Sequence, residues 1–453
     1  MVACLPPCKC NPPRAAVHPP SINRRNSLNT YPPPSSSTTR QHPQEPLILL
    51  HLGNCSNFNH LKTIHARIIR SSFFFTPPHH LRYHFLLRKL LYLSFSFLRF
   101  QYASRIFLYH VHFLSVDTFT WNLMIRSYNT HGYPFESLLL FNLIVSRGFP
   151  PPDKFTFPFV IKACCSEPCI SKGKEVHALA IKTGHSNDTF LYNVLMHFYF
   201  KSGDVVSARQ VFDKMPVRSV VSWTTFVAGL VASGLLDDAQ TAFDQMPTRN
   251  VVSWTAMIDG YVRHKRPQEA FELFSRMQFD KVRPNELTLV TLLRASIQLG
   301  SLSLGSWIHD YALKNGFRLG PFFGTALVDM YSKCGSLSDA KQVFDNMVTK
   351  NVATWNAMIT SLGVHGYGNE ALALFERMEE GNVRPDAITF VGVLCACAQM
   401  NDVNLANAYF KHMIEHYNIK PIWEHYTCLL ELYNRNMSNE VHQSVNAILT
   451  NET

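Results

Sequence analysis

The hydrophobic positions of this chain follow a helical period. The run that begins at Val251 shows the spacing clearly, with large apolar residues at Trp254, Met257, Ile258 and Tyr261. Residues at this spacing share one face of a helix. A second apolar run follows, and it contains an alanine and a phenylalanine three or four residues apart, a pairing that lets two helices approach and interlock. The pattern therefore predicts short amphipathic helices that occur in pairs.

The paired pattern restarts many times along the chain. The segments that begin at Val220, Val251 and Val352 open with the similar letters VVSWTTF, VVSWTAM and VATWNAM. Across the chain, the repeat units are 31 to 36 residues long. A period of this length predicts stacked repeats, in which each unit buries its apolar face only against its neighbours.

Local signals mark where helices begin and end inside a unit. We expect Ser222, Ser253 and Thr354 to be N-caps, because each precedes an aromatic-led apolar run. Glycines break the chain between the two helices, and prolines close the units because proline disfavours helix at the residue before it. These breaks and ends are Gly203, Gly234, Gly335 and Gly366, and Pro216, Pro247, Pro284 and Pro385.

The mixed period resembles the plant pentatricopeptide repeat proteins of the P–L–S type, over roughly residues 46–434. Units that end VRPN or VRPD resemble P repeats, the unit with YSKCG at 331–335 resembles an S repeat, and the unit with FPFVIKAC at 157–164 resembles an L repeat. The tetratricopeptide repeat keeps a uniform period of about 34 residues, so the alternation argues against it. The resemblance implies an all-α fold, a right-handed solenoid of stacked helix–turn–helix units.

The repeats divide the chain into four regions. We expect a disordered transit peptide over 1–45, degenerate repeats over 46–117, nine repeat units over 118–422, and a partial S-type repeat with a divergent tail over 423–453. The nine units are 118–153, 154–188, 189–219, 220–250, 251–285, 286–320, 321–351, 352–386 and 387–422.

The positive charge is concentrated at the N-terminus. The formal net charge is +10, but residues 1–116 hold 13 Lys/Arg and one acid, whereas 117–453 hold 29 Lys/Arg and 31 Asp/Glu. Bulk charge therefore does not identify a nucleic-acid surface in the repeats. Residues 1–45 are rich in Pro, Ser and Thr, with arginines and no acid before Glu45. This composition favours an organellar transit peptide, for the chloroplast rather than the mitochondrion, over a disordered tail without an address.

The sequence lacks the motifs of the enzymes that we considered. It has no Cys-x-x-Cys, and none of the His-x-Glu that a zinc deaminase needs. His177 and His309 recur at one repeat position, which favours helix packing over catalysis. The most apolar stretch, 81–98, contains three basic residues and is too short between them to span a bilayer. We therefore expect no catalytic residue, no metal site, no cofactor and no membrane contact.

Such repeats read one RNA base each with two or three side chains. The resemblance assigns this role to the fifth and the last residue of a unit, while apolar second residues, here Phe119, Val221 and Val252, pack against the bases. The pairs and the bases that the family's correspondence implies are Asn122 with Asp153 for U, Asn193 with Ser219 for C, Thr224 with Asn250 for A, Thr255 with Asn285 for A, Thr325 with Asn351 for A, and Asn356 with Asp386 for U. Three further pairs carry no assignment, namely Pro158 with Asp188, Val290 with Gly320, and Val391 with Ile422.

Because the family binds RNA with chain and strand parallel, these pairs predict the target 5′-UnCAAnAU-3′. We expect a single-stranded RNA-binding adaptor for organellar RNA maturation, either C-to-U editing or another processing event, with a deaminase or other factor supplied in trans. After Tyr426 the sequence departs from the pattern of complete editing-type members, and we expect it to lack complete extension domains. The alternatives are a protein-interaction scaffold on the same solenoid and a truncated, inactive editing-factor fragment.

Overall fold

The computed structural model describes residues 45–70, 80–113, 116–166, 169–185 and 187–436. The predicted transit peptide, except for its last residue, and the tail after 436 lie outside the described residues. The chain divides into two compact units, Met1–Thr76 and Pro77–Thr453. In the first unit, α1 (Glu45–Gly53) packs against α2 (Phe58–Arg70).

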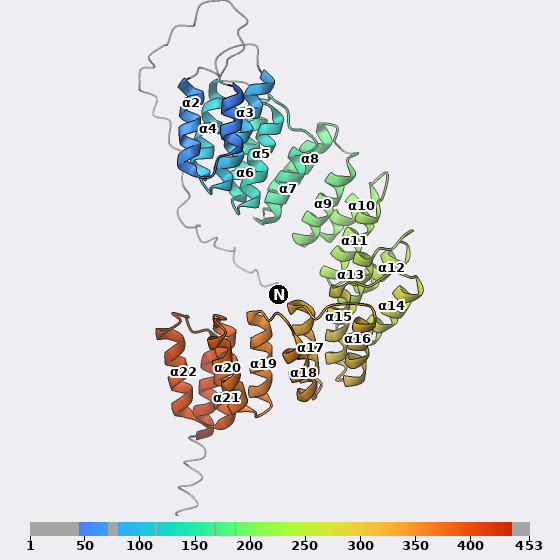
Figure 1. Cartoon of the computed structure of the whole chain (residues 1–453). Coiled ribbons are helices and arrows are strands. Elements are labelled where there is room, and N and C mark those ends of the chain that lie inside the picture. The colour runs from blue at the N-terminus through green and yellow to red at the C-terminus, as the bar shows by residue number, and fades with distance from the viewer. Residues whose placement is uncertain (1–44, 71–79, 114–115, 167–168, 186, 437–453) are drawn as a thin grey trace, which may run out of the picture. The chain divides into compact units, whose positions relative to one another are not determined.

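The second unit consists of helical hairpins in chain order (Figure 1). It begins with α3 (His80–Ser96) and α4 (Phe100–Phe113), and a helical stretch over 423–436 follows its last hairpin. The first helices of the hairpins between them are α5 (Thr118–Thr130), α7 (Thr156–Ser166), α9 (Thr189–Lys201), α11 (Val220–Ala232), α13 (Val251–Arg263), α15 (Glu286–Gln298), α17 (Pro321–Lys333), α19 (Val352–Val364) and α21 (Ala387–Met400). The second helices are α6 (Pro134–Arg147), α8 (Ile170–Lys182), α10 (Val205–Asp213), α12 (Leu236–Asp244), α14 (Pro267–Phe279), α16 (Leu302–Lys314), α18 (Leu337–Asn346), α20 (Gly368–Glu380) and α22 (Val403–Glu415).

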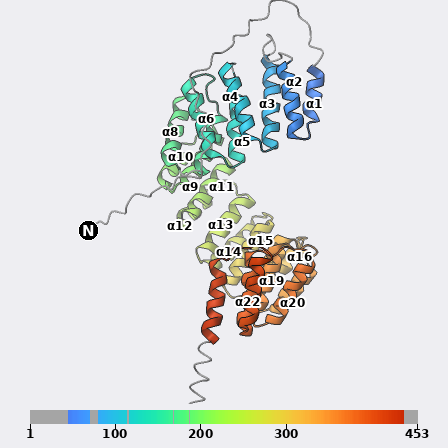
Figure 2. The ribbon, with the colours of Figure 1, turned by 90° about the vertical axis from the view of Figure 1, so that its left-hand side faces the viewer.

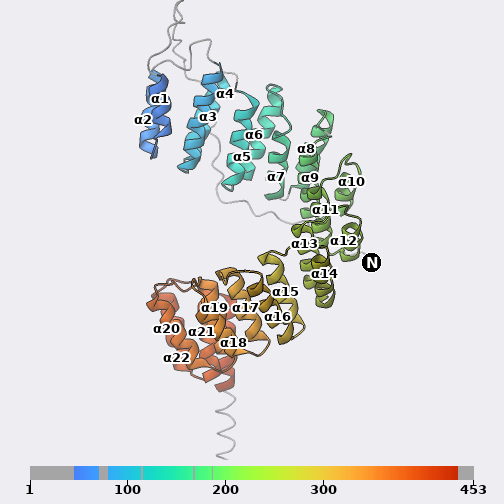
Figure 3. The ribbon, with the colours of Figure 1, turned by 45° about the vertical axis from the view of Figure 1, so that its right-hand side comes forward.

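Neighbouring hairpins stack in a regular way (Figure 2, Figure 3). Each first helix from α5 to α19 contacts the first helix of the next hairpin, and each second helix from α6 to α20 contacts that same next first helix. Both helices of a hairpin thus pack against the first helix of the hairpin that follows. The described residues contain helices and no strands, so the fold is an all-α helical-repeat solenoid, as the sequence pattern predicted.

The alanine and phenylalanine of the second helix form the joint between hairpins. Ala239 is fully buried, and the ring of Phe243 meets the indole of Trp254 edge-on at 4.8 Å between centroids. Phe344 and Trp355 repeat this contact at 5.2 Å. Such edge-to-face pairs add stability beyond the apolar area that they bury. The predicted interlocking of a small and a large residue is therefore confirmed, and the large partner is the tryptophan of the next unit.

The N-cap assignment from sequence is wrong. Ser222, Ser253 and Thr354 are the third residues of α11, α13 and α19, and they are buried. The caps lie three residues earlier, at Ser219, Asn250 and Asn351. The two apolar residues between the cap and the hydroxyl residue belong to the first helical turn. In α11 and α13 the serine at the third position completes a capping box with the polar residue before the helix. The last residue of one unit therefore caps the first helix of the next.

Candidate nucleic-acid interface

The last residue of a unit has one acceptor occupied by its capping role. The side-chain oxygen of Asn285 accepts from the backbone N–H of Thr288 at 2.9 Å, and Asn250 and Asn351 cap their helices in the same way. Asp153 and Asp386 each use Oδ1 for the same bond, to Thr156 and Thr389, at 2.9 Å. In the described part of the chain, the Nδ2 atoms of the three asparagines and the Oδ2 atoms of the two aspartates have no protein partner.

The structure brings two predicted asparagine–aspartate pairs into direct contact. Asn122 donates from Nδ2 to Asp153 Oδ1 at 2.8 Å, and Asn356 donates to Asp386 Oδ1 at 2.9 Å. The fifth residue of a unit thus lies beside the last residue of the same unit, although the second helix separates them in sequence. These contacts orient both side chains before any ligand arrives.

Two threonine–asparagine pairs are connected through a third residue. The hydroxyl of Thr255 lies 2.7 Å from that of Thr288, which donates to Asn285 Oδ1 at 2.8 Å. Thr325 lies 2.7 Å from Thr354, whose hydroxyl donates to Asn351 Oδ1 at 2.9 Å. The pairs are therefore linked by the buried third residue of the next first helix.

The remaining two pairs are not linked by hydrogen bonds within the described residues. Thr224 donates its hydroxyl to the carbonyl of Val220 at 2.7 Å and does not bond Asn250. The buried Oδ1 of Asn193 has no protein partner, and Ser219 bonds its own helix instead. The unassigned units have apolar fifth residues, Pro158, Val290 and Val391, and so offer no polar side chain there.

Apolar second residues lie exposed beside these pairs. Phe119 and Val221 are each 60% exposed and Val252 is 54% exposed. Five more exposed apolar side chains occupy the same position in other units, namely Phe155, Phe190, Leu287, Phe322 and Ile388. The sequence signal for these residues is an apolar side chain at the second position of the unit, on the otherwise polar face of the first helix. A repeated row of exposed apolar side chains marks an interaction surface.

Three of the six pairs, together with some of the exposed apolar residues, line two hollows along the first helices. One, of about 570 Å³, is lined by Thr224, Asn250, Val221 and Val252, among others. Another, of about 690 Å³, spans α15, α17 and α19. The predicted residues that line this second hollow are Thr325, Asn351, Asn356 and Asp386. The hollows thus combine polar groups that can meet base edges with apolar groups that can meet base faces.

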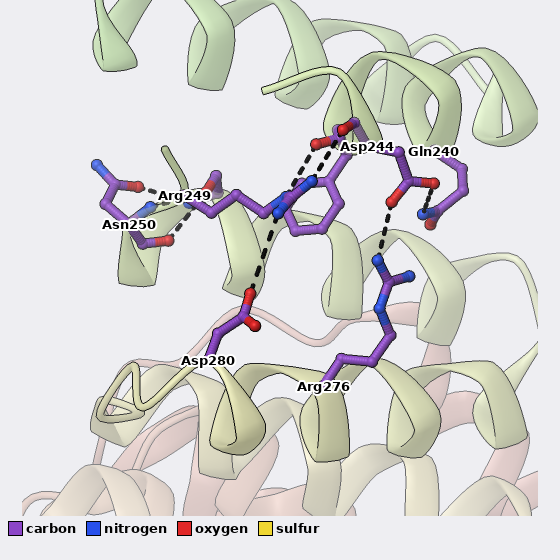
Figure 4. A network of polar contacts seen from close by, with 8 residues as sticks. Gln240, Asp244, Arg249, Asn250, Arg276 and Asp280 are labelled. Atoms are coloured by element: carbon purple, nitrogen blue, oxygen red, sulfur yellow. Dashed lines mark hydrogen bonds and ion pairs between the residues drawn. The ribbon is translucent and has the colours of Figure 1, made fainter. Parts of the chain in front are cut away.

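Arg249, which sequence reasoning missed, directly precedes Asn250 and anchors the backbone at this point. Arg249 donates to the carbonyls of Phe243 at 3.0 Å and Asp244 at 2.9 Å, and its guanidinium lies over the Phe243 ring at 5.0 Å (Figure 4). Arg218, which precedes Ser219, makes the equivalent bonds to Phe212 and Asp213. The signal available in the sequence is the basic residue that directly precedes the last residue of these units.

Charged groups from the next repeat surround this anchor. Burial by itself would raise the pKa of Asp244, but hydrogen bonds from Gln240 and Arg276 hold that pKa below its ordinary value. The ionised carboxylate of Asp244 therefore links α12 to α14 through Arg276, as Figure 4 shows. This network fixes the backbone from which Asn250 extends.

The described residues contain no cluster of three or more His, Cys, Asp or Glu side chains suited to a metal ion. Within the same residues, no helix combines the length and the apolar character needed to cross a membrane. His177 and His309 pack as the sequence predicted, each with a ring nitrogen bonded to a tyrosine hydroxyl, Tyr199 at 2.8 Å and Tyr331 at 3.0 Å.

Two family models match the chain. A model described as the PPR repeat family matches residues 249–297 and 350–399, and a model described as a PPR repeat matches 119–149, 190–220, 221–251 and 325–352. These matches fall on several of the hairpins described above, and PPR stands for pentatricopeptide repeat.

Curated relatives carry the same repeats. A chloroplastic pentatricopeptide repeat-containing protein of Arabidopsis thaliana is 55% identical over 88% of this chain and 85% of its own length. A second Arabidopsis protein, named chloroplastic/mitochondrial, is 36% identical over 89% of this chain, which spans 58% of that relative. The first name agrees with the chloroplast localisation predicted from residues 1–45.

Solved structures include the same fold. The crystal structure of a variant of the pentatricopeptide repeat protein PPR10 with three cysteine-to-serine substitutions, in complex with an 18-nt psaJ RNA element, matches with a TM-score of 0.55 at 15% identity. The match covers 82% of this chain and 60% of the crystallised one. At this identity the likeness concerns the helical-repeat fold alone.

Proposed function

Because the chain belongs to the pentatricopeptide repeat family, we propose that it is a sequence-specific single-stranded RNA-binding adaptor for RNA maturation in the chloroplast. The observation that carries this proposal is the row of polar pairs along the first helices, three of which line hollows, flanked by exposed apolar second residues. The PPR10 protein, which has the same fold, was crystallised with an RNA element.

The hydrogen bonds of the last residue explain how it distinguishes bases. Since capping occupies Oδ1, the asparagines at 250, 285 and 351 present Nδ2, which donates only. Adenine accepts at its Watson–Crick ring nitrogen, whereas guanine carries a proton there. Asp153 and Asp386 present Oδ2, which accepts only, and uracil carries a ring N–H. The last residue thus selects between a ring nitrogen that accepts and one that donates.

The proposed target follows from this rule together with the family's correspondence for the fifth residue. The six pairs assign U, C, A, A, A and U in chain order, and two units without a polar fifth residue leave gaps, so that the target is 5′-UnCAAnAU-3′. The ninth unit, with Val391 and Ile422, adds no assigned base. Its apolar Ile388 remains available to contact a base face.

The proposed role is that of an adaptor without chemistry of its own. RNA held along the first helices would be presented to a deaminase or another processing factor supplied in trans. The proposal covers both C-to-U editing and other maturation events. The groups in the hollows recognise bases and leave catalysis to that partner.

The proposal is tested by fluorescence anisotropy with the full chain and labelled U-n-C-A-A-n-A-U RNA, at stated salt because phosphate contacts make affinity salt-dependent. The control RNA carries guanines at the two central adenines. We expect tighter binding to the first RNA by about 1–3 kcal/mol for each changed base. Equal binding to both RNAs, or to neither, would favour the protein-interaction scaffold.

A further inference from the structure

After each of the six predicted base-reading pairs, the third residue of the following unit is a buried hydroxyl residue, and its identity varies. It is threonine at 156, 288, 354 and 389, and serine at 222 and 253, and all six side chains are fully buried. Each lies between the last residue of the preceding unit, which it helps to cap, and the fifth residue of that same unit. The third residue is therefore placed to act on both members of a base-reading pair.

The threonines contact both members of the pair. Thr389 donates to Asn356 Oδ1 at 2.6 Å and lies 3.1 Å from Asp386 Oδ1. Thr156 does the same, at 2.7 Å to Asn122 and 3.0 Å to Asp153. Thr288 and Thr354 reach the hydroxyls of Thr255 and Thr325, as described above. At these joints, one hydroxyl holds the fifth and the last residue in a fixed relation.

The serines bond only to the cap. Ser253 donates to the carbonyl of Asn250 at 2.9 Å and accepts from the Asn250 N–H at 3.1 Å, and it makes no bond to Thr224. Ser222 lies 3.0 Å from the Ser219 hydroxyl, and Asn193 Oδ1 is left without a partner. The γ-methyl group of threonine restricts its χ1 rotamers, whereas serine lacks that restriction and turns its hydroxyl to the local backbone.

We propose that the third residue of the next unit sets how strictly a pair discriminates its base, with threonine making the pair strict and serine making it permissive. This inference rests on the proposed RNA-binding function. A pair held by threonine loses little freedom on binding the correct base. Against a wrong base it cannot turn away, so that its oriented polar groups stay unpaired, which is costly. A pair next to serine can readjust and tolerate the mismatch.

The chain contains its own comparison. The pairs Thr224/Asn250 and Thr255/Asn285 consist of the same residue types, and both are assigned to adenine. They differ at the joint, where the first is followed by Ser253 and the second by Thr288. The two central adenines of the target should therefore be read with unequal strictness, the second more strictly than the first.

The test exchanges the two hydroxyl residues in the full chain, as S253T and T288S, and measures Kd for three RNAs by anisotropy. The RNAs are the target and two variants with guanine at the first or the second central adenine. In the unmodified chain we expect stronger discrimination at the second adenine, by about two- to tenfold, the effect of one net hydrogen bond. S253T should raise discrimination at the first adenine only, and T288S should lower it at the second only.

T288V is a further control, because valine keeps the shape and the methyl group but lacks the hydroxyl. T288V should reduce discrimination at the second central adenine at least as much as T288S does. The T288S protein keeps a buried hydroxyl, so it tests whether the threonine methyl group is needed for that discrimination. If the unmodified chain prefers adenine at both sites equally and neither exchange changes either ratio, the inference is wrong while the RNA-binding function stands. If the unmodified chain does not distinguish the RNAs at all, the proposed function fails, and the inference fails with it.

Discussion

Asn356 and Asp386 are joined by a hydrogen bond of 2.9 Å, although 30 positions separate them in the chain. Asp386 belongs to the end of one unit, yet it is also the cap of α21 in the next. The pair therefore forms only when two hairpins stack. The same geometry joins Asn122 to Asp153, so that the candidate base-reading groups are a property of the joints between repeats.

The change Asn250→Asp should switch the base preferred by the third assigned pair, Thr224 with Asn250, which is the first of the adenine pairs. Aspartate keeps the capping oxygen but presents an acceptor in place of Nδ2, and guanine offers a ring N–H where adenine has a lone pair. We expect guanine to be favoured at the first central adenine by about 1–3 kcal/mol, measured as the ratio of Kd values for the two RNAs.

Asn285→Asp is the matched change, and it should make guanine preferred in place of the second central adenine. A loss of binding to every RNA, without a switch, would contradict the proposed role of the last residue. The capping oxygen is retained in both variants, so their thermal unfolding should match that of the unmodified chain.

Phe119→Ala should weaken RNA binding without altering base preference. The Phe119 ring is exposed at the second position of its unit, with the Arg88 guanidinium over it at 4.2 Å. Stacking of a base on an aromatic side chain contributes about 1–3 kcal/mol and tolerates any base. Phe279→Ala, at a ring that is 87% exposed and outside the hollows, should leave the Kd unchanged. Equal losses for the two variants would argue against a contact at Phe119.

Gly229→Ala should destabilise the solenoid. A Cβ at this position of α11 would lie 2.1 Å from the ring of Phe200 in the preceding hairpin, and that ring is itself buried. Overpacking of this kind costs about 1–3 kcal/mol. The measurement is the midpoint of thermal unfolding, compared with Gly53→Ala, where no atom lies within 4 Å of the added methyl. Equal midpoints for the two variants would show that the side chains between α9 and α11 can shift to accommodate the added methyl group.

Stability should fall as the pH drops below about 6.5, the ordinary pKa of histidine. Burial lowers the pKa of His177 and of His309 in the folded chain, so the unfolded chain binds these protons more readily. Protonation in this window therefore favours unfolding, and the loss continues until the pH has passed below the folded-state pKa values.

The double variant His177→Gln, His309→Gln should flatten this pH dependence, measured by urea unfolding at pH 7.5 and pH 5.5. Glutamine keeps a polar partner for Tyr199 and Tyr331 but does not titrate. A slope that persists unchanged in the double variant would assign it to other groups.

Sequence reasoning succeeded where a pattern is local and repeated. The spacing of Trp254, Met257, Ile258 and Tyr261 predicted a helix, and α13 is that helix. It failed at the caps, because a serine before an aromatic residue looks like a cap, although the true cap lies one turn earlier. The predicted unit boundaries and base assignments stay predictions.

The sequence by itself determined the class of fold and the repeat, and it supplied the candidate base-reading side chains, because each depends on residue type and on a period within one helix. Only the tertiary structure decided which of these side chains are joined. Thr288 lies against Thr255, whereas Ser253 bonds the Asn250 backbone and not Thr224, and the contact between the two threonines exists only because two hairpins stack. A one-dimensional pattern contains the residues of a joint, but the orientation of a buried hydroxyl depends on the neighbour that closes over it.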